Sequence, residues 1–173
     1  MIEQLSSLND RTVVISGASR GIGLAIGIAV ARQGANVVLL AKTATPHPRL
    51  PGTVHTAAAE IDAAGGRAAA VVGDVRNAED VGRAVGVAVD RFGGVDICVN
   101  NASAIATDPT ENPMSASRSP EIMADAAAEI LSRPARETTG NCYIDEDVLL
   151  AAGGYDLSRY GGGSQPILDL FIG

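Results

Sequence analysis

The chain has 173 residues, enough to bury one hydrophobic core but too few for two domains of ordinary size. Its formal charge of −7 argues against a nucleic-acid partner, because binding to phosphates requires clustered lysines and arginines, and the sequence has no such cluster. The apolar runs are too short to cross a membrane, and the first residues lack the basic-then-apolar order of a signal peptide, so we expect a soluble, cytoplasmic protein.

From residue 12 to residue 100, short β-branched runs alternate with longer segments of helical period. This alternation is typical of a parallel sheet covered by helices. Strands that are buried on both faces are almost entirely apolar. The predicted strands are Thr12–Ser16, Asn36–Leu40, Ala68–Val72 and Val95–Val99.

Three amphipathic helices are expected between these strands, at about residues 21–33, about 53–64 and after Asn77. Asn77 is a favourable N-cap residue for the third of them. The spacing of its apolar residues predicts one buried stripe, made of Val81, Ala84, Val85, Ala88, Val89 and Phe92.

The pattern changes after Asn101. Residues 102–118 are rich in Pro, Ser, Thr, Asn and Asp and are predicted to form a loop. A helix is expected after Ser119, with Pro120 at its first position, and then a short final strand over Asn141–Ile144. We therefore expect one domain over residues 1–150 and a flexible, Gly-rich tail over residues 151–173.

Cys98 and Cys142 both fall in predicted strands, with no His or Cys at metal-ligand spacing. Two buried, reduced thiols are therefore expected, and a disulfide is the alternative. The sequence predicts no metal site.

The motif SGASRGIG lies between the first predicted strand and the first predicted helix. Glycines let the backbone turn sharply there, so that a pyrophosphate can approach the N–H groups at the positive end of the helix. A plain tight turn is the alternative. The predicted nucleotide contacts are Gly17, Ala18, Ser19, Arg20, Gly21, Ile22 and Gly23.

The end of the second strand distinguishes the two nicotinamide dinucleotides. NAD-selective sites place a carboxylate there for the ribose 2′-hydroxyl, whereas a 2′-phosphate requires cations. This strand ends in Ala41-Lys42, and Arg20 lies in the glycine turn, so NADP is favoured as the cofactor. The alternative is that both side chains are ordinary surface charges.

Polar residues also follow the third and fourth strands. Asp74, followed by Val75, places a carboxylate where an adenine amino group could donate to it, although Asp74 alone is typical of a cap or turn. Asn100 and Asn101 lie at the carboxyl edge, where ligands of open α/β sheets bind. Their amides could equally bridge backbone groups of neighbouring loops.

The motifs SGASRGIG, Gly73-Asp74-Val75 and VNNAS together resemble the short-chain dehydrogenase/reductase family, in the family's order and spacing, over about residues 8–149. AKT and SRSPEIMADAAAEIL…TGNCYIDEDVL look closest to its hydroxysteroid-dehydrogenase-like branch. The resemblance implies a Rossmann-like doubly wound parallel sheet. It also implies NADP contacts from the glycine turn, Lys42, Asp74 and Asn100-Asn101, and an oxidoreductase that transfers a hydride to or from a carbonyl or alcohol.

The family's chemistry uses a Tyr-x-x-x-Lys pair and a Ser, in which the lysine lowers the pKa of the tyrosine acid. This sequence has no such pair, and Arg159 follows Tyr155 at the spacing where the family has lysine. Family members carry many more residues between VNNAS and the final helix and strand. We therefore predict no catalytic residues and expect that the catalytic segment and the usual dimer helices are missing.

A crossover from the fourth strand through the Ser119 helix could place Asn141–Ile144 beside that strand. The shortened sheet would then have five strands in the order 3-2-1-4-5. Three functions remain open. The first is an oxidoreductase that takes its acid from elsewhere, and the second is a non-catalytic NADP-binding module or truncated gene product. The third is a structural or interaction protein whose glycine turn is vestigial and binds no nucleotide. The substrate and the oligomeric state remain open.

Overall fold

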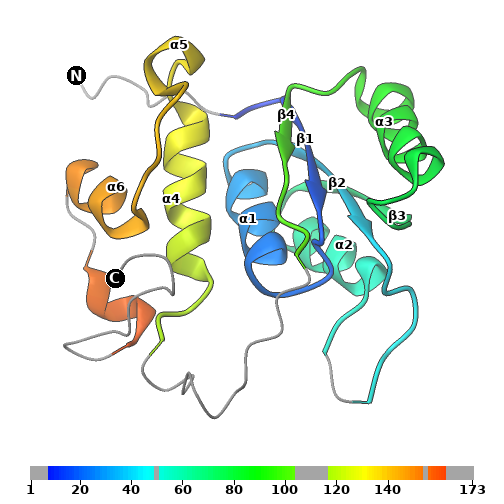
Figure 1. Ribbon diagram of the computed structural model, residues 1–173, viewed down its shortest axis with the longest axis horizontal. Helices are drawn as coiled ribbons and strands as arrows, with labels where there is room; N and C mark the ends of the chain where they lie inside the picture. The colour runs from blue at the N-terminus through cyan, green and yellow to red at the C-terminus, as the bar shows by residue number, and fades with distance from the viewer. Residues whose placement is uncertain (1–7, 49–50, 104–116, 154–155, 163–173) are drawn as a thin grey trace.

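Four parallel strands form the centre of the molecule in the order β3-β2-β1-β4 (Figure 1). The computed structural model describes residues 8–48, 51–103, 117–153 and 156–162. The strands are β1 (Thr12–Ser16), β2 (Asn36–Ala41), β3 (Arg67–Val72) and β4 (Ile97–Val99). The α/β class and the order of these four strands agree with the prediction.

The two faces of the sheet carry separate cores because successive side chains of a strand point to opposite sides. Val13, Ile15, Val37 and Leu39 belong to one buried cluster. The alternate residues Val14, Val38 and Leu40 belong to the other, together with Ala69 and Val71. Both faces are buried, which explains the nearly continuous apolar runs of β1 and β2.

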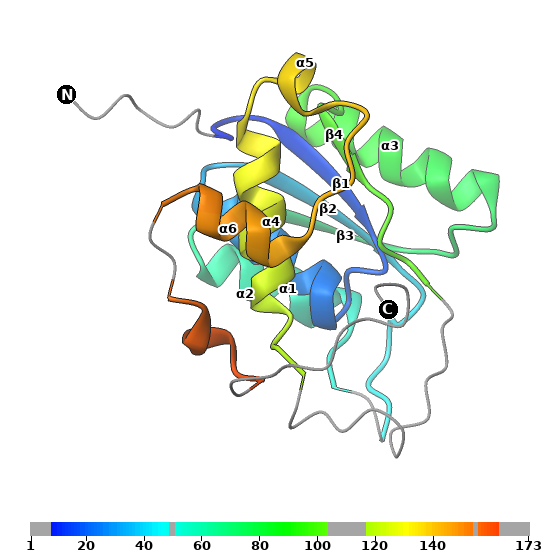
Figure 2. The same cartoon turned by 60° about the vertical axis from the view of Figure 1, so that its left-hand side comes forward.

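Helices cover both faces. On one face lie α1 (Gly21–Arg32) and α2 (Val54–Ala63), with α4 (Glu121–Ser132) beside α1 (Figures 1 and 2). On the other face lies α3 (Ala78–Phe92), whose Asn77 side chain accepts a hydrogen bond from the Glu79 N–H, as its predicted capping role requires. In the part of the chain that the structure describes, no helix has the length and apolar character needed to cross a bilayer.

The C-terminal residues form a small cluster of their own on the outer side of α4. It contains α6 (Asp145–Ala151) and the 3-10 helix η2 (Leu157–Tyr160), whereas the short helix α5 (Ala135–Thr138) has no buried residue. The buried side chains of the cluster are Ile122, Ala126, Val148, Leu149 and Tyr160. Residues 157–160 of the predicted flexible tail therefore pack against the folded body.

The predicted fifth strand is wrong. Residues 141–144 form neither helix nor strand and are exposed. Their chain follows α4, which packs beside α1, and it remains on the outer side of α4 away from β4 (Figure 1). A strand needs a neighbour for its backbone N–H and C=O groups, and among the described residues this segment pairs with no strand. Most of the predicted loop, residues 104–116, lies outside the described residues.

Two burial predictions are also wrong. On α3 only Ala84 and Ala88 of the predicted stripe are fully buried, whereas Val81, Val85 and Val89 are 38%, 43% and 51% exposed. The helix α3 packs against β1, β2 and β3 with Ala84 and Ala88 buried and with Val87 and Phe92 partly buried, which leaves these valines beside the contact. The two cysteines are free, as expected, but both are exposed.

Candidate nucleotide-binding site

The turn between β1 and α1 holds the motif glycines in a conformation that other residues would strain. Gly17 and Gly21 have φ angles of +70° and +57°, in the left-handed region that glycine adopts readily. A Cβ atom on Gly23 would lie 2.5 Å from Asn101 Nδ2 and 2.9 Å from the Gly17 carbonyl oxygen. The absence of side chains therefore lets the turn approach the end of β4.

Asn101 and Ser16 join the ends of β4 and β1. Asn101 Nδ2 donates to the carbonyl oxygens of Ser16 (2.9 Å) and Gly17 (3.3 Å). The Ser16 hydroxyl oxygen accepts from the N–H groups of Asn101 and Ala102, both at 3.1 Å. The Asn101 amide therefore has the structural role that the sequence left open, since it bridges backbone groups of neighbouring loops.

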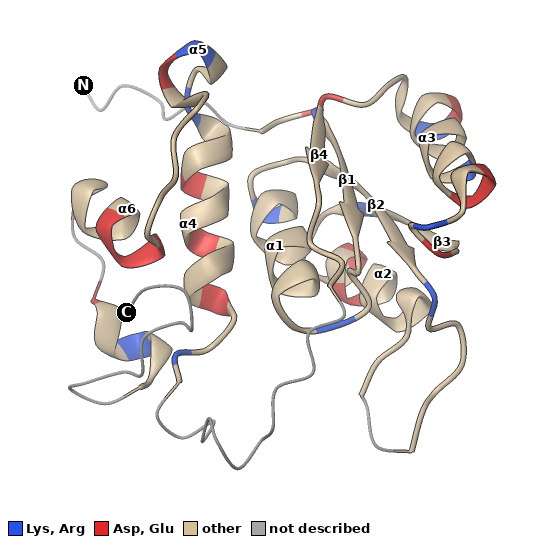
Figure 3. Ribbon diagram, viewed as in Figure 1, with Lys and Arg blue, Asp and Glu red and all other residues tan. Residues whose placement is uncertain are grey.

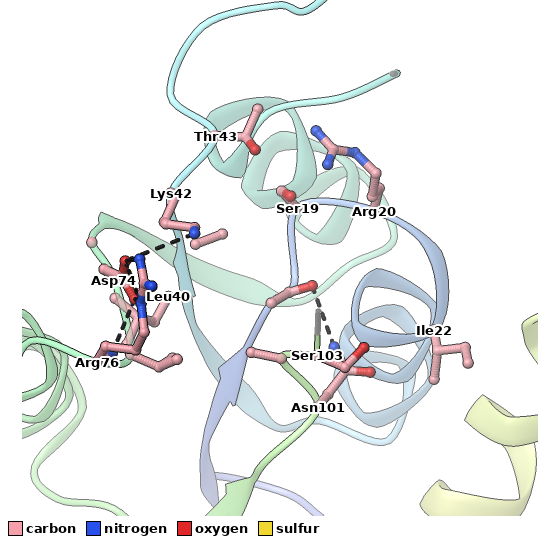
Figure 4. A pocket seen from close by; sticks show the side chains of 15 residues that line it. Ser19, Arg20, Ile22, Leu40, Lys42, Thr43, Asp74, Arg76, Asn101 and Ser103 are labelled. Atoms are coloured by element: carbon pink, nitrogen blue, oxygen red, sulfur yellow. Dashed lines mark hydrogen bonds and ion pairs between the residues drawn. The ribbon is translucent and has the colours of Figure 1, made fainter. Parts of the chain in front are cut away.

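A pocket of about 600 Å³ opens at the carboxyl ends of the four strands (Figure 4). Most of the predicted nucleotide contacts line it, namely Gly17, Ser19, Arg20, Ile22, Lys42, Asp74, Val75 and Asn101. The remaining four, Ala18, Gly21, Gly23 and Asn100, do not. Ala18 is fully buried behind the turn, and Asn100 Oδ1 is 3.9 Å from Cys98 Sγ, which donates to it.

The N-terminus of α1 adjoins this pocket. Arg20 occupies the N-cap position, but its side chain makes no capping hydrogen bond to the helix. The first N–H groups of a helix have no partner within the helix, and they form its positive end. An anion in the pocket would meet these groups directly.

The charged side chains of the pocket lining are Arg20, Lys42, Asp74 and Arg76, which are three cations and one carboxylate. This local balance is the reverse of the formal charge of −7 for the whole chain. Many of the acidic residues lie instead on α3, α4 and α6 (Figure 3). The pocket therefore favours an anionic ligand in an acidic protein.

The Arg20 side chain connects the glycine turn to the loop that precedes α2 through two hydrogen bonds. Its Nε donates to the Pro51 carbonyl oxygen at 2.8 Å, and its Nη2 donates to that of Gly52 at 3.1 Å. Both acceptors are neutral. These two bonds therefore bring no carboxylate to the Arg20 guanidinium, and they fix its position at the rim of the pocket.

Asp74 is held between two cations. Arg76 Nη2 lies 2.6 Å from Asp74 Oδ2, and Lys42 Nζ lies 3.7 Å from the same atom. The hydrogen bonds from the Arg76 side chain and backbone, together with the Lys42 charge, hold the pKa of the Asp74 carboxyl well below its ordinary value. The backbone bond, from Arg76 N–H to Asp74 Oδ1 at 3.0 Å, is the turn interaction typical of aspartate.

Several lining residues were not predicted from the sequence: Leu40, Ala41, Thr43, Gly73, Arg76, Ala102 and Ser103. Most of them are direct neighbours of predicted contacts at strand ends. Arg76 had a usable signal, because an aspartate commonly bonds to the backbone N–H two residues later and thereby places the next side chains.

Known proteins resemble this chain in sequence and in overall fold. The family model described as short chain dehydrogenase matches residues 11–124. That match spans well over half of the chain. The chain belongs to the short-chain dehydrogenase/reductase family. Members of this family bind a nicotinamide dinucleotide, NAD or NADP.

Individual relatives agree with the family. Hydroxysteroid dehydrogenase-like protein 2 from Danio rerio is 55% identical over 115 residues, which are 66% of this chain and 28% of that protein. The Homo sapiens protein of the same name is 52% identical over 110 residues, 64% of this chain and 26% of that protein. The matched part is thus little more than a quarter of these relatives.

Solved structures match over nearly the whole chain. A short chain dehydrogenase from Mycobacterium thermoresistibile aligns with a TM-score of 0.87 and 34% identity, covering 96% of each chain. A structure from Xanthomonas campestris aligns with a TM-score of 0.90 and 31% identity, covering 96% of this chain and 99% of that one. The C-terminal helices are therefore part of the shared fold.

The described tyrosines of this short-chain dehydrogenase/reductase chain lie away from the pocket. Tyr160 is buried among α4, α6 and η2, and its hydroxyl donates to Asp125 Oδ2 at 2.6 Å. The Tyr143 hydroxyl donates to the Thr138 carbonyl oxygen at 3.4 Å. Tyr155 lies outside the described residues. Within the described ranges, no group of His, Cys, Asp or Glu side chains could hold a metal ion.

Proposed function

We propose that the chain binds NADP(H) in the pocket at the carboxyl edge of the sheet. The observation that carries the proposal is the charge of the pocket lining, which contains three cationic side chains, Arg20, Lys42 and Arg76, and a single carboxylate. That carboxylate, Asp74, is already bonded to Arg76. A ligand with several phosphates fits this balance better than a neutral one does.

The pyrophosphate would lie at the N-terminus of α1. Support comes from the first turn of that helix, to which the Arg20 side chain makes no capping hydrogen bond, and from the positive φ angles of Gly17 and Gly21 in the turn before it. Ser19 and Ile22 line the pocket at this point. The Ser19 hydroxyl would donate to a phosphate oxygen, and Ile22 would cover an apolar part of the cofactor.

The 2′-phosphate would lie beside Lys42, with Arg20 at the rim. An acceptor for a free ribose 2′-hydroxyl is expected at the end of β2 in an NAD-selective site. Here the residues at that place in the lining are Ala41, Lys42 and Thr43, none of which is acidic. Lys42 is 67% exposed, so its ammonium group can turn toward a phosphate without breaking a buried contact.

The bound cofactor would supply or accept the hydride, and the chain would supply its binding site. A carbonyl substrate also requires a proton donor, which the family provides through Tyr-x-x-x-Lys. Lys42 is the only lysine of this sequence, and it lies in the nucleotide pocket, so the pair is absent. We propose that the catalytic segment is lost and expect no turnover by this chain alone.

A thermal-shift titration with NADPH and NADH tests the binding proposal. NADPH at one hundred times its dissociation constant raises the free energy of unfolding by about 2.7 kcal/mol, and NADH at the same concentration raises it less. Lys42→Gln should weaken NADPH binding about fivefold and leave NADH binding unchanged, since it removes one exposed charge from the 2′-phosphate. Arg67→Gln, at the opposite end of β3, is the control.

Two outcomes would contradict the binding proposal in different ways. Equal stabilisation by NADPH and NADH would exclude a 2′-phosphate site at Lys42. If neither nucleotide stabilises the chain, the pocket is not a binding site for NADPH or NADH. Steady consumption of NADPH with any ketone in a panel would overturn the expectation that this chain lacks turnover.

A further inference from the structure

Asp74 has two cationic neighbours, Arg76 and Lys42, and Arg76 lies much closer to its carboxylate than Lys42 does (Figure 4). Arg76 Nε lies 3.1 Å from both carboxylate oxygens, and Arg76 Nη2 lies 2.6 Å from Oδ2. Lys42 Nζ lies 3.7 Å from Oδ2, beyond hydrogen-bond distance. A planar guanidinium that bonds both oxygens is the stronger partner of a carboxylate.

The position of Asp74 itself does not depend on either cation. Its own N–H donates to Asp80 Oδ2 at 2.7 Å, and its Oδ1 accepts from the Arg76 backbone N–H at 3.0 Å. A substitution of the Arg76 side chain keeps both backbone bonds. The carboxylate would then remain in the pocket wall with one cation left beside it, Lys42.

We propose that Arg76 is a specificity-determining positioning residue, which occupies Asp74 and thereby leaves the Lys42 charge available to the 2′-phosphate of NADP(H). This inference rests on the proposed function. Without Arg76, Asp74 would bind Lys42 as its remaining partner. The pocket would then present a less positive surface to the phosphate, and the preference for a 2′-phosphorylated nucleotide would fall.

The ratio of two affinities measures this preference independently of overall binding. Adenosine 2′,5′-bisphosphate and AMP differ by the 2′-phosphate alone, and neither needs the nicotinamide part of the site. Titration calorimetry of both ligands gives the ratio for the wild-type chain and for Arg76→Gln, Asp74→Asn/Arg76→Gln and Arg67→Gln. Arg67 also forms an exposed ion pair, with Asp10 at 3.0 Å, and is the matched control.

The wild-type chain should prefer the bisphosphate. Arg76→Gln should lower the preference about three- to fivefold, which is the range of one exposed charge interaction. Asp74→Asn/Arg76→Gln should restore the preference, even if loss of the carboxylate weakens both ligands equally. Arg67→Gln should leave the ratio unchanged.

Each other outcome counts against the inference. An unchanged ratio in Arg76→Gln shows that Arg76 does not control Lys42. A lowered ratio that the double variant fails to restore shows that Arg76 contacts the phosphate itself. A wild-type chain with no preference, or with no binding of either ligand, contradicts the proposed NADP site, and the role of Arg76 falls with it.

Discussion

The region around the sheet and the C-terminal region are stabilised in different ways. Between residues 12 and 99, each strand pairs with its neighbours, and the three helices between them cover the sheet they connect. Between residues 117 and 162 the described chain contains no strand apart from a single bridge of Arg118 with Gly161. This second region depends on one helix, α4, which packs beside α1 through Ala124 and Ala128.

This difference separates binding from the rest of the fold. The lining residues lie between Gly17 and Ser103, in the sheet region and in the turn directly after β4, and α4, α5 and α6 contribute none of them. Nucleotide binding should therefore survive damage to the C-terminal region. Damage to the glycine turn should instead affect binding and folding together, because the turn joins β1, α1 and the end of β4.

Ala128→Asp has the largest expected effect on the C-terminal region. Ala128 is 3% exposed in the cluster that includes α1, and an unpaired carboxylate there costs about 3 to 5 kcal/mol. Limited proteolysis should then cleave after residue 117, while AMP binding persists. Met123→Asp, at a 43% exposed position of the same helix, should resist cleavage like the wild type. Loss of AMP binding in Ala128→Asp would show that the two regions are not independent.

Gly23→Ala should have the next largest effect, on the sheet region. The added Cβ would meet the Asn101 amide and the Gly17 carbonyl oxygen, and such overpacking costs about 1 to 3 kcal/mol. Urea denaturation should show this loss, together with weaker nucleotide binding.

Gly82→Ala on α3 is the matched control for that substitution. A Cβ at Gly82 would meet no atom within 4 Å, so the helix should gain about 0.5 to 1 kcal/mol of stability. A Gly23→Ala chain as stable as the wild type would mean that the turn can move away from Asn101.

The sequence predicted the sheet region well because its signals are local. β1 runs over the predicted residues, and β2 and β3 each differ from the prediction by one residue at one end. These strands are buried on both faces, so their apolar composition marks them directly. Gly17, Lys42 and Asp74 line one pocket because the carboxyl ends of parallel strands meet at one edge, and their contact with a nucleotide stays a prediction.

The errors fall where a partner distant in the sequence decides the outcome. Asn141–Ile144 has the composition of a strand, but α4 packs beside α1 and leaves it without a neighbour. The valines of α3 have the right periodicity, but the periodicity does not tell how wide a stripe the sheet covers. Arg76 was missed as a lining residue because its place depends on the orientation of Asp74, to which it is bonded in the loop after β3.

Asp80→Asn, at the start of α3, has the smallest expected effect, which is a change in how stability depends on pH. Asp80 accepts from the Asp74 N–H and lies 2.6 Å from Arg83 Nη1, and these bonds lower the pKa of its carboxyl below the ordinary value of 3.8. A lowered pKa in the folded state stabilises the fold above the unfolded pKa, and this contribution is lost as the pH falls through the folded value. Acid titrations of the melting temperature measure this loss. Below about pH 4, the melting temperature of the wild type should fall more steeply than that of Asp80→Asn. The control is Asp90→Asn, on the exposed side of α3, which should follow the wild type. Parallel acid limbs for the wild type and Asp80→Asn would mean that the Asp80 bonds do not contribute to the stability of the sheet region.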